Sequence, residues 1–230
     1  MGNVDEDCRR FIKTELPVET HSALCLLPTQ YLSSAPLQAM LDGFQTDLSF
    51  RDGDNWPIKD QEALELYGVR VAGTVAELCL NLIFHHTPDR VPKDEQQELI
   101  ESAVTMGVAL QIVNIARDIE VDARIGRVYV PTTWLKEVDL SPADIVKQPD
   151  HPINSKLRKR LLNLAWQRYN ESRGAIERLP IEARAPLRTA VENYMEIGRV
   201  LSEGGYRTKN GKATVPLLRR LRTAWRAMNA

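Results

Sequence analysis

The sequence has few of the residues that mark several large classes of protein. Its three cysteines, Cys8, Cys25 and Cys79, are odd in number, far apart in the chain and never arranged as a CxxC pair. A disulfide-stapled scaffold and a cysteine-ligated zinc site are therefore excluded, and a reducing compartment such as the cytoplasm is expected. An excess of charge of one sign is also absent, since 30 Lys and Arg balance 31 Asp and Glu. Binding to nucleic acid through a basic surface is not expected.

Long hydrophobic runs are equally scarce. The longest, residues 71–84, is interrupted by Glu77 and Asn81 and is too short to span a bilayer. The N-terminus is acidic and polar, unlike a secretory signal. An integral membrane protein is therefore not expected, whereas peripheral contact with a membrane remains open. With 230 residues, of which 43% are hydrophobic, the chain can bury a substantial core and is too apolar for disorder.

Apolar residues recur with helical spacing along most of the chain. Helices are predicted over residues 36–49, 59–86, 94–121, 132–137, 141–147, 154–178, 183–203 and 213–228. Alternation typical of a strand is confined to residues 128–130, which is too little for a sheet. The pattern predicts an all-α fold with one helical domain at 20–230, preceded by a polar segment at 1–19 that we expect to be disordered.

A polar ridge interrupts the second long predicted helix. On a helix that turns about 100° per residue, four polar side chains fall within about 80° of one another: Gln111, Asn114, Asp118 and Asp122. Carboxylate and amide oxygens one turn apart suit Mg²⁺, which bridges to phosphate oxygens. The alternative is a solvated stripe whose charges pair with neighbouring arginines: Arg117, Arg124 and Arg127. Spacing alone does not favour either interpretation.

Two further segments also allow a functional and a structural interpretation. Small residues at 72–76, on the helix that carries Tyr67, would admit either an apolar ligand or a closely packed helix. Arg124 and Arg127 flank Gly126 directly after the ridge. They could clamp phosphate oxygens, or they could belong to an ordinary helix C-cap.

Three stretches together resemble the squalene/phytoene synthases. Residues 67–75 resemble the family's Y-x-x-x-V-A-G-x-V segment. Residues 111–131 resemble its second aspartate-rich signature, Q-x-x-N-I-x-R-D-x-x-x-D-x-x-x-G-R-x-Y-x-P. Residues 213–216 and 225–227 are similar to phytoene synthase endings. The resemblance covers about residues 20–228 and is greatest to the synthase half of fungal lycopene cyclase/phytoene synthase fusions.

The resemblance implies an isoprenoid-synthase-type helical bundle around a central apolar cavity, and it implies a role for each matching residue. Asp118 and Asp122, with Asn114, would hold Mg²⁺, or the similar Mn²⁺, against a prenyl diphosphate. Four further residues would contact that diphosphate: Gln111, Arg117, Arg124 and Arg127. Tyr67 would lie beside the departing diphosphate, and Tyr194 would hydrogen-bond to it.

The implied reaction is the head-to-head condensation of two geranylgeranyl diphosphates to phytoene through prephytoene diphosphate, a step of carotenoid biosynthesis. The segment around Tyr129 is closer to the phytoene than to the squalene synthase type. The family's first aspartate-rich motif is not found, because Asp42 and Asp47 lie about 140° apart on their predicted helix. The bundle is therefore expected to be incomplete on its N-terminal side.

An incomplete bundle leaves alternatives open. A non-catalytic homologue that binds prenyl diphosphate, or an assembly partner, is the alternative to an active synthase. Exposed apolar surface would favour a homodimer or a complementing chain. The protein would be cytoplasmic or peripherally membrane-associated, and membrane-bound if it forms part of a larger cyclase fusion.

Overall fold

The computed structural model describes residues 4, 6–26, 32–50, 55–203, 208–209 and 212–230. The regular secondary structure in this part of the chain is helical except for one antiparallel pairing, in which β1 (Thr208–Lys209) pairs with β2 (Lys212–Ala213). The all-α prediction is therefore confirmed. The helical elements follow one another in this order: α1 (Glu6–Glu15), α2 (Val18–Leu26), α3 (Ala35–Ser49), α4 (Gln61–Gly68), η3 (Val69–Gly73), α5 (Thr74–His86), α6 (Lys93–Arg124), α7 (Thr132–Lys136), α8 (Pro142–Lys147), α9 (Asn154–Ser172), η4 (Arg173–Arg178), α10 (Ile181–Glu203) and α11 (Leu217–Met228).

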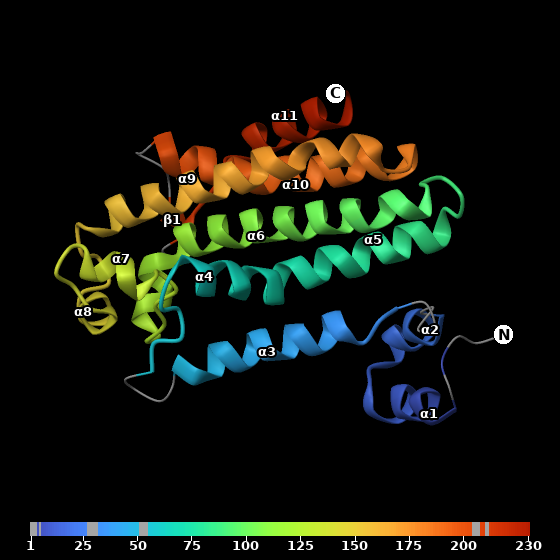
Figure 1. Cartoon of the computed structure of the whole chain (residues 1–230), viewed down its shortest axis with the longest axis horizontal. Helices are drawn as coiled ribbons and strands as arrows, with labels where there is room; N and C mark the ends of the chain where they lie inside the picture. Colours follow the sequence, from blue (N-terminus) through green and yellow to red (C-terminus); the bar gives the residue numbers. More distant parts are fainter. Residues whose placement is uncertain (1–3, 5, 27–31, 51–54, 204–207, 210–211) are drawn as a thin grey trace.

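The helices stack in layers, with α6 in the middle (Figure 1). On one side α6 packs against α4, η3 and α5, and α3 lies beyond these; on the other side it packs against α9 and α10, and α11 covers α10. In the middle of α6, from Met106 to Ala116, buried apolar residues occur on every side of the helix. A helical segment that is apolar on all sides needs neighbours on all sides, which explains its central place.

Close contact between α6 and the preceding helix depends on small residues. A Cβ added to Gly107 would lie 2.8 Å from backbone atoms of Ala72 and Gly73, and one added to Gly73 would lie 2.8 Å from Val104. The prediction of tight helix packing at the small residues is therefore confirmed. The same segment also lines a cavity, so that the two interpretations of these residues do not exclude each other.

The elements differ from the sequence-based prediction in several places, which include helix α2, for which no helix was predicted. The helix predicted at 59–86 contains a π turn, η3, and the helix predicted at 154–178 ends in the 3₁₀ turn η4. The last helix starts at Leu217, after Pro216, because residues 212–213 form β2 instead. Helix α1 lies within the segment at 1–19, where disorder was expected.

Two continuous helical segments, Gln61–His86 and Lys93–Arg124, are long and apolar enough to cross a membrane by length and composition. Their apolar side chains pack against each other within the bundle, as core helices do. Apolar surface is nevertheless exposed along one face of α3, the α3 stripe, whose members are Leu37, Leu41, Phe44 and Leu48.

Candidate functional site

The polar ridge predicted on α6 lies inside the bundle. Asp118 is only 4% exposed, and Gln111, Asn114 and Asp122 are half-buried. Buried carboxylates are costly unless they are paired or bind a cation. The exposure expected of a solvated stripe is therefore not found at Asp118, whereas the pairing with Arg117 that this interpretation expected is found.

Arg117 organises the ridge. Its Nε and Nη2 atoms donate to the two carboxylate oxygens of Asp118, at 2.8 and 2.6 Å, and Nη2 also donates to Oδ1 of Asn114. The hydrogen bonds to Asp118 raise the pKa of Arg117, so the guanidinium stays charged. The hydroxyl of Tyr194, on α10, donates to the same Asn114 oxygen at 3.2 Å, and burial raises the pKa of Tyr194. Four predicted site residues thus form one network.

The two arginines after the ridge have different environments. The N–H of Gly126 bonds to the carbonyl of Ala123, and that of Arg127 to the carbonyl of Asp122, which is a Schellman C-cap with Gly126 at φ +77°. Arg124 is exposed and lies about 200° around the helix from Asp122, so it does not join the cluster. Arg127 does join it. Burial acts to lower the pKa of Arg127, but nearby Tyr129, Asp47 and Asp122 raise it.

Asp47 is a site residue that sequence reasoning missed. Oδ1 of Asp47, on α3, accepts hydrogen bonds from the hydroxyls of both Tyr67 and Tyr129, each at 2.8 Å. The two tyrosine rings stack with centroids 5.1 Å apart. Burial is the largest of several effects that raise the pKa of each tyrosine, and the neighbouring Asp47 carboxylate adds to it. Both phenols are therefore held in their protonated, hydrogen-bond-donating form.

Because these tyrosines are buried, we expect the free energy of unfolding to fall at alkaline pH. Unfolded tyrosines ionise near pH ~10, whereas Tyr67 and Tyr129 have raised pKa values in the folded chain. Below about pH 10 both states keep the phenol proton and the stabilisation is complete. As the pH rises further, the unfolded state ionises first, and the free energy of unfolding falls. Urea unfolding at about pH 8 and about pH 10.5 measures this fall.

The Tyr67→Phe variant provides the control, because it removes one of the two phenols and keeps the ring. The free energy of unfolding of this variant should fall less between the two pH values than that of the unchanged chain. An equal decline in both proteins would show that Tyr67 does not contribute to the effect.

An apolar cavity of about 470 Å³ runs beside the ridge. Small residues of η3 and α5, such as Ala72 and Ala76, line it on one side, and Ala175 and Ile176 of η4 line it on another. Along α6 it extends from Leu99 to Gln111, a rise of about 18 Å. Gln111 and Tyr194 belong both to its lining and to the polar part of the site. The cavity therefore joins an elongated apolar space to a polar end.

The polar end offers oxygen ligands for a divalent cation but does not form a complete metal cage. Within the described residues, no group of three or more His, Cys, Asp or Glu side chains is placed to hold a metal. Asp118, Asp122 and Asn114 supply two carboxylates and an amide oxygen on one helix face. The two carboxylates fit Mg²⁺, which usually takes one or two of them and completes its shell with water and phosphate oxygens. Oδ1 of Asn114 accepts from Arg117 and Tyr194, so it would exchange one of these hydrogen bonds for the cation.

Comparison with known proteins identifies the family of the chain. A family model described as squalene/phytoene synthase matches residues 9–220. The chain belongs to the squalene/phytoene synthase family. Two curated relatives from this family are fungal proteins named bifunctional lycopene cyclase/phytoene synthase. The one from Gibberella fujikuroi is 53% identical over 96% of the chain, and the one from Pyrenophora tritici-repentis is 50% identical over 94%.

The chain spans 38% and 37% of the length of these two relatives. Solved structures support the fold. A dehydrosqualene synthase crystallised with a ligand superposes with a TM-score of 0.72 at 21% identity, covering 97% of this chain and 76% of that one. A squalene synthase from Alicyclobacillus acidocaldarius gives a TM-score of 0.65 at 21% identity, covering 89% and 73%. The predicted isoprenoid-synthase-type bundle is therefore confirmed.

Proposed function

We propose that this chain carries the prenyl-diphosphate site of a phytoene synthase, which condenses two geranylgeranyl diphosphates head to head. The observation that carries the proposal is the junction between the apolar cavity and the ridge of Asp118 and Asp122. A prenyl diphosphate has the same two parts, a long apolar chain and a strongly charged end. The name phytoene synthase in the fungal relatives supports this choice of product over squalene.

The polar end is suited to hold and release diphosphate. Asp118, Asp122 and Asn114 would hold Mg²⁺, which when bound neutralises charge on the departing diphosphate. Arg117 fixes the orientation of Asp118 through its two hydrogen bonds. Arg127 lies at the same end and adds a positive charge for phosphate oxygens.

Two tyrosines can assist the leaving group as hydrogen-bond donors. Each phenol is protonated at neutral pH, and the raised pKa of Tyr67 and of Tyr194 extends this state to alkaline pH. Tyr67 donates to Asp47, and Tyr194 donates to Asn114, so the position of each hydroxyl is fixed before substrate arrives. To assist the leaving group, each O–H would turn from its present acceptor to a diphosphate oxygen.

The cavity suits the carbocation that remains. Its lining is dominated by alanine, valine and leucine side chains, and these keep water away from a reactive allylic cation. The second prenyl double bond can then capture the cation before water does. The same lining orders the apolar chain along α6, which would bring its reacting end to Gln111 and Tyr194.

The described residues supply one set of carboxylates, so we expect binding to be easier to detect than turnover. A second set would come from another copy of this chain or from a complementing chain. The alternative function, a non-catalytic homologue that binds prenyl diphosphate, is favoured by the same observation, since the described part of the chain holds no group of three acidic or histidine ligands. We propose a cytoplasmic or peripherally membrane-associated location, with membrane anchoring if the chain is part of a cyclase fusion.

The test separates binding from chemistry. Titration calorimetry with geranylgeranyl diphosphate should show binding that requires Mg²⁺ and is lost on chelation with EDTA. Incubation of the purified chain with the same two components, followed by extraction, measures phytoene. Phytoene would support the synthase, whereas binding without product would favour the non-catalytic alternative. Absence of both would contradict a prenyl-diphosphate site.

A further inference from the structure

Helix α11 exposes an apolar face that the bundle does not cover. Four of its side chains lie within about 80° of one another and form the α11 stripe: Leu218, Leu221, Trp225 and Met228. Leu218 is 81% exposed and Trp225 is 67% exposed. Ala227, on the opposite side of the helix, is buried. The helix therefore turns its small residue inward and its large apolar residues outward.

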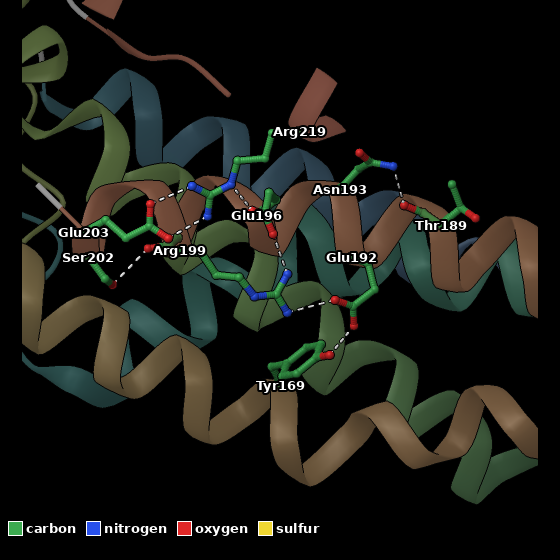
Figure 2. Close-up of polar contacts among 10 residues, drawn as sticks. Tyr169, Thr189, Glu192, Asn193, Glu196, Arg199, Ser202, Glu203 and Arg219 are labelled. Atoms are coloured by element: carbon green, nitrogen blue, oxygen red, sulfur yellow. Dashed lines mark hydrogen bonds and ion pairs between the residues drawn. The ribbon is translucent and has the colours of Figure 1, made fainter. Parts of the chain in front are cut away.

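Ion pairs with α10 hold α11 in this orientation. Arg219 reaches across to Glu203, with contacts of 2.6 and 2.7 Å, and also binds Glu196, as Figure 2 shows. Arg199 bonds to Glu196 at 2.7 Å and to Glu192 at 2.8 Å, which continues the network along α10. Because Glu196 is buried and accepts from both arginines, the network fixes α11 against α10 rather than leaving it free to turn over.

Positive charge borders the α11 stripe. Arg222 and Arg226 lie about 40° and 80° around the helix from Leu218, along one edge of the stripe, and both are exposed. They also line a cleft of about 630 Å³ between α10 and α11. Arginines outnumber glutamates in that cleft by six to two. α11 itself carries four arginines and no Asp or Glu. An anionic surface would complement this edge.

We propose that α11 is a membrane-docking helix, which lies in the surface of an anionic phospholipid bilayer with its stripe among the acyl chains and with Arg222 and Arg226 at the headgroup phosphates. Helices of this kind combine an aromatic and aliphatic face with a basic polar face and lie parallel to the membrane plane. The proposal does not depend on the catalytic function, because α11 lies on the far side of α10 from α6 (Figure 1).

The dimensions of the stripe favour a membrane over a protein partner. A twelve-residue helix is about 18 Å long, and its apolar face is about 10 Å wide. A stable protein interface needs about 800 Å² of accessible surface from each partner, more than four exposed side chains supply. A lipid surface has no such minimum, since it surrounds each inserted side chain, and its phosphates satisfy the bordering arginines.

The test is co-sedimentation of the full chain with vesicles of phosphatidylcholine, with or without phosphatidylserine. Binding should require phosphatidylserine and weaken with salt, because the headgroup attraction is screened. The Leu221→Ser/Trp225→Ser variant should bind at least about tenfold less tightly, since the apolar contribution is removed. The Arg222→Gln/Arg226→Gln variant should lose about tenfold to thirtyfold, since each basic residue near an anionic surface contributes about fivefold.

The α3 stripe offers a matched control, because it is an exposed apolar helix face without bordering arginines. Leu41→Ser/Phe44→Ser should leave vesicle binding unchanged. Circular dichroism should show native helix content in every variant, since all of the substituted side chains are exposed.

Failure of the unchanged chain to bind vesicles, or an equal loss of binding in the α3 and α11 variants, would overturn the proposal. So would light scattering in which the α11 substitution converts a dimer to a monomer, which would make the stripe a contact between copies.

Discussion

Replacing Gly107 with alanine is expected to lower the free energy of unfolding by about 2–3 kcal/mol. The added Cβ would lie 2.8 Å from the carbonyl carbon and oxygen of Ala72 and from the amide nitrogen of Gly73. These are backbone atoms, which cannot rotate away as a side chain can, so α6 and η3 would have to separate. Alanine's better helix propensity returns at most about 1 kcal/mol. Urea unfolding followed by circular dichroism measures the difference.

Gly198→Ala is the matched control within α10. A Cβ there would meet side-chain atoms of Leu162, Val113 and Trp166 at 3.5–3.7 Å, which is ordinary contact distance. Its stability should be unchanged or higher by about 0.5–1 kcal/mol, because alanine restricts the unfolded chain more than glycine. If Gly107→Ala proved as stable as Gly198→Ala, the close approach of α6 to η3 would be wrong.

Neutralising Asp118 should have the largest effect on ligand binding. Asp118→Asn keeps the shape of the side chain but removes a charge that is 4% exposed. The Mg²⁺-dependent affinity for geranylgeranyl diphosphate should fall by about a hundredfold or more, because a buried charged ligand is lost and Arg117 is left with a weaker partner. Titration calorimetry with and without Mg²⁺ measures this change.

Arg124→Gln removes a charge from the same helix and should change the affinity by less than about twofold, since Arg124 is exposed and points away from the ridge. Should Asp118→Asn fail to fold, Asp122→Asn tests the same ridge at a half-buried position. Unchanged Mg²⁺-dependent affinity in a folded ridge variant would show that the carboxylates serve packing and not ligand binding.

Helical periodicity was sufficient to place the ridge, because Asn114, Asp118 and Asp122 lie on a single helix whose geometry is known in advance. Asp47 could not be found in this way. Its partners, Tyr67 and Tyr129, are 20 and 82 residues away, on other elements. Comparing angles on one helix reveals which residues share a face, but it does not reveal which helix comes to lie opposite.

The loop after the ridge shows a related limit. The spacing of Arg124 and Arg127 around Gly126 is compatible both with a phosphate clamp and with a helix cap. The structure has the cap, and only Arg127 is turned toward Asp122 by it. Which of two nearby arginines faces a site depends on the turn geometry of one glycine at φ +77°, which helical spacing does not describe.

The π turn η3 has a consequence for how much the chain can vary in length. The N–H of Thr74 bonds to the carbonyl of Val69, five residues earlier, so this turn holds one residue more than an α turn. In an uninterrupted α-helix Tyr67 and Ala76 would point in opposite directions, about 180° apart. The extra residue reduces this angle to about 80°. The continuous segment α4–η3–α5 therefore presents the Tyr67 phenol to the polar end and the small side chain of Ala76 to the cavity. Deleting any single residue of 69–73 would convert the π turn to an α turn and keep Tyr67 and Ala76 aligned, because eight residues at about 100° each also give about 80°.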